Sequence, residues 1–115
     1  GKTSAEDFNT LLPNLVRQGK HLTLVDAGCI LETTGSSAVT VTIPAAATVP
    51  FEIGTLINVT QVGAGVATVT AAAGVSLNGV VGGSVALDGQ WAGAALTKRG
   101  AEAWVIQGAL AGTVA

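Results

Sequence analysis

From His21 onward the chain is built of short runs in which apolar and polar residues alternate, and this feature restricts its possible folds most. Residues 39–43 and 67–70 are two such runs. Alternation with this period places successive side chains on opposite faces of an extended chain, as in a half-buried β-strand. The runs are separated by turn signals such as Asn78-Gly79 and Asp88-Gly89. The pattern therefore predicts strands joined by tight turns.

About eight to nine short strands at near-regular spacing predict an all-β fold. We expect a compact antiparallel β-sandwich, barrel or prism, formed by a β domain of residues 19–115. The sequence lacks the regular alternation of strands and helices that is typical of a nucleotide-binding sheet. One domain with one core fits a chain of 115 residues.

Residues 1–18 differ from the rest and predict a short N-terminal helical arm. Thr3 and Glu6 have the spacing of a capping box. Four large apolar residues follow at helical spacing, namely Phe8, Leu11, Leu12 and Leu15. Pro13 is expected to break or kink the helix. The apolar stripe either packs on its own domain or docks on another subunit, in which case these four residues bind the partner.

The apolar residues of the chain are mostly small or β-branched. Hydrophobic residues make up 49% of the sequence, whereas aromatic residues make up only 3%. Because burial stabilises by about 25 cal/mol per Å² of apolar surface, such side chains give a monomer a thin core. We therefore expect the chain to bury further surface against other copies of itself, as a homotrimer.

The charges of the chain argue against several partners. Only 10% of the residues are charged and the net charge is −2, with no cluster of Lys and Arg. Binding to nucleic acid requires such a cluster, so we expect no nucleic-acid partner. No uninterrupted apolar run reaches the roughly 18 residues of a membrane span, so we expect no membrane partner either.

Gly63-x-Gly65 follows an apolar run, as glycines do in loops that bind phosphate. A phosphate loop needs a following helix whose N-terminal amides point at the anion. The residues after Gly65 instead have the alternation of a strand, and the Lys and Ser or Thr of a Walker motif are missing. We interpret residues 62–65 as a hairpin turn and not as a nucleotide site.

No group of residues has the spacing of a catalytic or metal site. His21 is the only histidine, and its nearest carboxylate, Asp26, would face the opposite side of a continuous strand. Cys29 lies among apolar neighbours and is expected to be a buried, unreactive thiol. We expect no enzymatic activity, no catalytic residue, no bound metal and no cofactor.

The two tryptophans receive different interpretations. Trp104 lies within an alternating run and is predicted to fill the core. Trp91 follows a turn, and its side chain has three possible roles, namely core residue, subunit contact or ligand platform. We name Trp91 as a possible subunit contact.

The order of strand and turn segments resembles a small β-domain of tailed-phage virion proteins, which include capsid decoration proteins, head fibres and tail-fibre modules. The matching segments are residues 22–28, 39–44, 50–55, 61–65, 74–77, 89–92, 96–100 and 104–108. The resemblance implies a structural role in a virion, in a trimer or another symmetric oligomer. It transfers no catalytic residue, because the matching segments contain none.

The resemblance leads to a functional expectation with two alternatives. We expect a capsid decoration or cement protein that lies on the virion's capsid surface and binds the major capsid protein or other virion proteins. A module of a tail fibre or other tail appendage, involved in attachment to the host, is the first alternative. A carbohydrate-binding module or small enzyme is the second, and it requires Trp91 to be exposed beside polar residues or a convergent cluster of acids or histidine.

Overall fold

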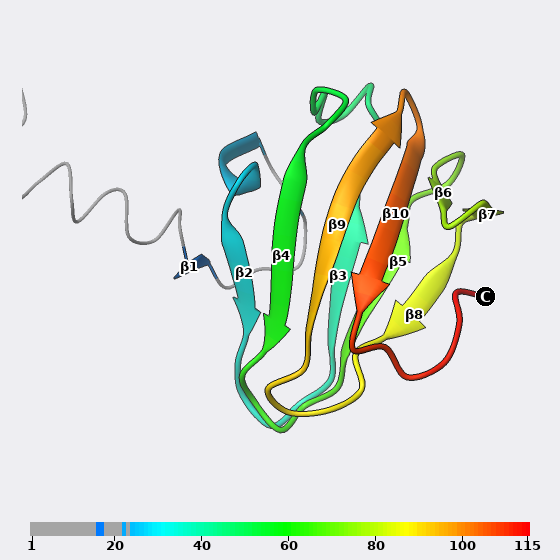
Figure 1. The fold of residues 1–115 in the computed structure, drawn as a ribbon. Coiled ribbons are helices and arrows are strands. Elements are labelled where there is room, and N and C mark those ends of the chain that lie inside the picture. The colour runs from blue at the N-terminus through cyan, green and yellow to red at the C-terminus, as the bar shows by residue number, and fades with distance from the viewer. Residues whose placement is uncertain (1–15, 18–21, 23) are drawn as a thin grey trace, which may run out of the picture.

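The computed structural model describes residues 16–17, 22 and 24–115, and these form two β-sheets packed face to face (Figure 1). The larger sheet has the strand order β1-β2-β4-β9-β10-β6-β7, and the smaller sheet, behind it in the figure, has the order β3-β5-β8. The larger sheet comprises β1 (Val16–Arg17), β2 (Ile30–Thr33), β4 (Leu56–Gln61), β9 (Gly93–Gly100), β10 (Ala103–Gly108), β6 (Ser76–Leu77) and β7 (Val80–Val81). The smaller sheet comprises β3 (Val39–Ile43), β5 (Ala67–Ala71) and β8 (Ser84–Ala86). The expected all-β fold is confirmed for this part of the chain.

The expectation of purely antiparallel sheets is wrong, because both sheets are mixed. β2 pairs in parallel with β4, and β3 pairs in parallel with β5. Ile30 lies opposite Asn58 and Val39 lies opposite Ala67, so both pairs have the same offset of 28 residues. The chain thus makes two stacked coils, of which the first is formed by β2 and β3 and the second by β4 and β5. It crosses from the larger to the smaller sheet after β2 and again after β4. A crossing between sheets returns the next strand in the same direction, whereas a hairpin would reverse it.

The interpretation of residues 62–65 as a hairpin turn is also wrong, because β4 and β5 belong to different sheets. This crossing lies directly against the equivalent crossing of the first coil, and Gly65 donates a backbone hydrogen bond to Gly35 O at 3.1 Å. A Cβ atom on Gly63 would overlap the carbonyl oxygen of Gly35 and lie 2.6 Å from its nitrogen. A Cβ on Gly65 would overlap the carbonyl group of Ser37 in the same way. These glycines permit the close stacking of two backbones.

The second half of the domain contains two hairpins, and the one at the Asn78-Gly79 turn signal is confirmed, whereas Asp88-Gly89 lies in the connection from β8 to β9, which belong to different sheets. Asn78 and Gly79 both have positive φ, at 49° and 81°, and join the antiparallel strands β6 and β7. β9 and β10 form the second hairpin, and β9 also pairs with β4. The chain after β10 then runs along the outer edge of β8, where Ser84 and Ala115 exchange two backbone hydrogen bonds. That edge is therefore covered.

The core lies between the sheets and contains Trp104, as predicted, with 2% of its surface exposed. Phe51 meets the Trp104 ring edge-on, with a centroid distance of 5.4 Å. One buried residue that the sequence did not predict is Lys98, which is 4% exposed. Its Nζ donates a hydrogen bond to Phe51 O at 2.6 Å, which offsets part of the cost of removing an ammonium group from water.

The start of the β domain differs from its prediction. Residues 22–24 have the alternation of a strand, but Leu24–Asp26 form a short 3-10 helix. Leu22 lies in the core and donates its backbone N–H to Thr42 O at the edge of β3. Of the predicted helical arm, residues 16–17 form β1 beside β2, and residues 1–15 and 18 lie outside the described residues.

Candidate functional site

Three connections between the sheets come together at the lower end of the domain in Figure 1. They comprise residues 34–38, 62–66 and 88–92, and we call them the loop end. A backbone hydrogen bond joins the first two, since the N–H of Gly65 donates to Gly35 O at 3.1 Å, and the N–H groups of Val62 and Gly63 donate to Thr33 O at the end of β2. Gln90 Nε2 joins the third to the second by donating to Val62 O at 3.0 Å. The three connections therefore support one another.

Gln61 holds the loop end from inside, because its side chain is only 1% exposed. Its Oε1 accepts the backbone N–H of Ala67 at 3.0 Å, and its Nε2 donates to Gly63 O at 3.2 Å. Its own backbone N–H donates to Ala92 O and its carbonyl accepts the N–H of Trp91. One buried carboxamide residue thus fixes residues 62–66 and the chain around Trp91 together, so that neither segment is a loose loop.

Trp91 is the most unusual residue of the loop end. It has a φ of 70° although it is not a glycine, and its side chain is 70% exposed. A large residue in this conformation costs on the order of 1–3 kcal/mol and persists only where its surroundings enforce it. Here the hydrogen bond to Gln61 O and the tether through Gln90 supply that constraint. Strained residues of this kind cluster at functional sites.

The loop end carries little charge, and its exposed residues include both the apolar Trp91 and Val66 and the polar Thr34, Ser36, Ser37 and Gln90. Asp88 is the one ionisable residue in its three segments. Val66 is 48% exposed on the connection next to that of Trp91. A surface with a rigid, exposed indole and little charge can bury apolar area at low desolvation cost, as the anchor residues of protein interfaces do. Its one carboxylate is that of Asp88, and its hydroxyl groups are those of Thr34, Ser36 and Ser37.

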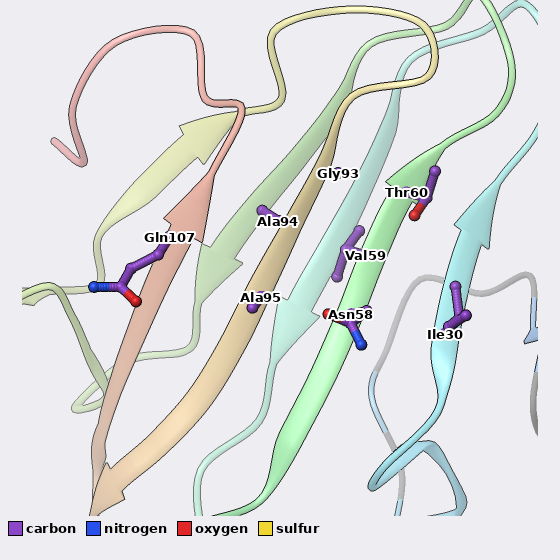
Figure 2. A pocket seen from close by; sticks show the side chains of 8 residues that line it. All are labelled: Ile30, Asn58, Val59, Thr60, Gly93, Ala94, Ala95 and Gln107. Carbon is purple, nitrogen blue, oxygen red and sulfur yellow. The ribbon is translucent and has the colours of Figure 1, made fainter.

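A second feature lies on the outer face of the larger sheet, and we call it the outer groove (Figure 2). It has a volume of about 340 Å³. Its lining residues come from β2, β4, β9 and β10 and include Ile30, Asn58, Thr60, Gly93, Ala95 and Gln107. Gly93 and Ala95 alternate with buried residues along β9, so their outward positions carry almost no side chain. The signal for the groove was therefore visible in the sequence as a Gly-x-Ala spacing.

The structure places the residues singled out from the sequence as follows. Trp91 lies at the surface, so its interpretation as a core residue is wrong, whereas subunit contact and ligand platform both require the exposure that it has. The four apolar residues of the arm lie outside the described residues, as does His21; these are Phe8, Leu11, Leu12 and Leu15. Among the residues that the structure describes, no three His, Cys, Asp or Glu side chains gather in a way that could hold a metal ion. The described segments also contain no helix of the length and apolarity needed to span a membrane.

Cys29 is buried, as predicted, and its surroundings disfavour the thiolate. Desolvation by burial raises the pKa of the Cys29 thiol, and the negative charge of Asp26 raises it further. We expect Cys29 in the folded protein to react with iodoacetamide at pH 8 on the order of tenfold more slowly than in denaturant, because little thiolate forms and access is poor. Mass spectrometry of the alkylated protein over time measures this rate. Equal rates in the folded and denatured states would contradict the prediction.

Comparison of the chain with protein-family models, with curated proteins and with solved structures finds no match. Function is therefore inferred from the residues of the chain itself.

Proposed function

We propose that the chain is a structural protein of a tailed-phage virion, and specifically a decoration or cement protein of the capsid surface. The observation that carries this proposal is the loop end, where Trp91 is 70% exposed on a rigid and nearly uncharged support. Such a surface suits lasting contact with another protein. The resemblance in the order of strands and turns supplies the virion context.

The mechanism that we propose is mass action. A protein that binds the closed shell, but not its separate subunits, stabilises the shell by its binding free energy. The arm of residues 1–18 would reach onto the coat lattice through its four apolar residues. The connection to the β domain is β1, where Val16 lies opposite Ile30 at the edge of the larger sheet. A capsid-bound arm would thus be attached to the β domain through β1, a strand that is paired with β2.

Deletion of residues 1–15 tests the role of the arm, because it retains β1 and with it the pairing to β2. We expect the truncated protein to lose co-sedimentation with purified capsids while its circular dichroism spectrum and melting temperature stay near those of the parent. The matched control is Thr10→Ala, which alters the arm but keeps its apolar stripe and should co-sediment like the parent. Undiminished capsid binding by the truncated protein would count against the arm.

A second candidate function is that of a tail-appendage module that contacts the host surface. The observation that favours it is the position of Trp91 beside the exposed side chains of Gln90 and Asp88. An indole face next to polar groups is the arrangement that a carbohydrate-binding surface also requires. Immunogold labelling of purified particles distinguishes the candidates, since label on the head supports decoration and label on the tail supports attachment. A glycan array compared between the parent and Trp91→Ala tests for a sugar ligand.

A further inference from the structure

An apolar area stays exposed at the end of the domain where β2 and β4 begin, which is the upper end in Figure 1. Four of the seven exposed large hydrophobic side chains in the described part of the chain lie at or just before the starts of these two strands, namely Leu24, Ile30, Ile53 and Leu56. Exposed apolar side chains that gather in one place mark a surface suited to contact with protein.

The area continues over the outer face of the larger sheet. Leu56 lies opposite Thr97, and Thr97 lies opposite Val105, so a row of outward side chains crosses β4, β9 and β10. The next row contains Ile30 and Ala95, one on each side of β4. We call Ile30, Leu56, Ala95 and Val105 the apolar face.

β1 brings the N-terminal arm to this end of the sheet. Val16 lies opposite Ile30, the first residue of β2, and the two strands are parallel. The chain that precedes Val16 therefore reaches the sheet from the end at which β2 begins, beside the apolar face. Residues 1–15 lie outside the described residues, and this segment carries the apolar stripe of Phe8, Leu11, Leu12 and Leu15. The kink expected at Pro13 can turn the chain from the edge strand onto the face of the sheet.

We propose that, in the free protein, this apolar stripe lies across the apolar face of its own β domain. An α-helix rises about 1.5 Å per residue, so the distance along the stripe from Leu15 to Phe8 is about 10 Å. Neighbouring strands lie about 4.8 Å apart, so the distance from β2 across β4 to β9 is also about 10 Å. With Leu15 held next to β1, Leu11 and Leu12 contact Leu56 on β4, and Phe8 contacts β9.

The charges of the two surfaces favour the arm as the occupant. Residues 24–115 contain two cationic side chains, of which Lys98 is buried and Arg99 is exposed near the upper end of β9. Arg99 points to the outer face, since Lys98 before it points to the core. Glu6 and Asp7 precede the stripe, so the proposed orientation brings their carboxylates toward Arg99. Glu32, a carboxylate on the same face, lies further along β2 toward the loop end and stays outside the covered area.

Docking of the stripe on its own domain goes beyond the proposed function, because it occurs in purified protein without a capsid. A coat protein that binds the same stripe has to displace it from the apolar face, so the free protein keeps its apolar side chains covered until it meets the shell. A contact of this size opens locally below the temperature at which the domain melts. Proximity is therefore a more direct measure of the contact than the melting temperature.

Disulfide trapping in the dilute, purified full chain measures this proximity. Leu12→Cys combined with Leu56→Cys places one thiol on the stripe and one on the apolar face. In a glutathione redox buffer, we expect the effective concentration of these two thiols to exceed that of two control pairs at least about tenfold, because a flexible connection alone has no preferred position. The first control replaces Leu12→Cys by Thr10→Cys, since Thr10 lies off the stripe. The second replaces Leu56→Cys by Val81→Cys, since Val81 is exposed on β7, and peptide mapping by mass spectrometry excludes Cys29 as a partner.

Charge reversal tests the orientation of the arm. Arg99→Glu is expected to lower the effective concentration of the stripe–face pair about two- to fivefold, the effect of an exposed ion pair. Glu6→Lys together with Asp7→Lys is expected to restore it in the Arg99→Glu protein. An unaltered value in Arg99→Glu would overturn the proposed orientation. If Leu56→Cys melts without cooperativity, Ala95→Cys replaces it in the pairs that contain it, since Ala95 belongs to the same face.

Two further results of the trapping experiment decide against the contact. Equal effective concentrations for the three pairs would overturn it, because a stripe that is free for another protein has no preference for its own domain. A disulfide between two chains that dilution removes would overturn it as well, and would assign the apolar face to a second copy. A stripe–face disulfide in a protein that does not co-sediment with capsids supports the contact and contradicts the proposed function alone, so the two failures are distinguishable.

Discussion

Replacement of Gly63 or Gly65 by alanine is expected to destabilise the domain by about 3 kcal/mol or more, enough to unfold a marginally stable protein of this size. The added Cβ would overlap the backbone of the first coil, at Gly35 for one glycine and at Ser37 for the other. Overpacking against side chains costs about 1–3 kcal/mol, since side chains can move. Here the obstacle is main chain, held by the hydrogen bond from Gly65 N to Gly35 O. Relief therefore requires the two coils to separate.

The domain supplies its own control for this experiment. Gly89 lies at the same end of the molecule, does not have positive φ, and has no heavy atom within 4 Å of the Cβ that alanine would add. Gly89→Ala should change the free energy of unfolding by less than about 0.5–1 kcal/mol, and reduced flexibility of the unfolded chain could make the change favourable. Urea denaturation followed by circular dichroism measures all three variants. If Gly65→Ala is as stable as Gly89→Ala, the result contradicts the close contact between the backbones of the two coils at Gly65.

The class of fold could be predicted from the sequence because alternation is a local property. Along β5 the side chains alternate between buried and half-buried positions, as the pattern of residues 67–70 requires. The Asn78-Gly79 hairpin could also be predicted, because those two residues are the ones that adopt positive φ most readily. Both signals involve neighbours in the chain, and tertiary contacts did not override them.

The direction of the strands could not be predicted in this way, because a run with period two has the same form in parallel and antiparallel sheets. The missing information was a comparison of the chain with itself at an offset of 28 residues. At that offset Gly35 corresponds to Gly63, and the segment 40–42 has the same sequence as 68–70. Gly63 and Gly65 were assigned to a hairpin because a glycine pair between two strands most often forms a turn. In the structure they instead lie directly against the backbone of the first coil.

Individual side chains of the site were predicted unevenly, for physical reasons. The alternation of β9 places Lys98 on the same face as Leu96, but a lysine is rarely buried, and only the nearby Phe51 carbonyl makes its burial tolerable. The exposure of Trp91 follows from how Gln61 fixes the neighbouring connections, which involves residues 30 positions away. The sequence could therefore identify Trp91 as a candidate but could not place it.

Replacement of Trp104 by alanine is expected to lower the free energy of unfolding by about 3–5 kcal/mol, the usual cost of removing a large aromatic side chain from a core. Trp104 is 2% exposed, and its loss would leave a cavity beside Phe51, whose ring it contacts edge-on. The cavity would also adjoin the buried Lys98, which lies opposite Trp104 on the neighbouring strand. Water that enters there would compete for the Phe51 carbonyl, to which the Lys98 ammonium donates.

Trp91→Ala is the matched control, because it removes the same side chain from a position that is 70% exposed. In dilute protein, where copies do not associate, it should change the free energy of unfolding by no more than about 0.5 kcal/mol. Guanidinium denaturation followed by circular dichroism compares the two variants independently of indole fluorescence. Equal losses for the two tryptophans in dilute protein would contradict the assignment of one to the core and the other to the surface.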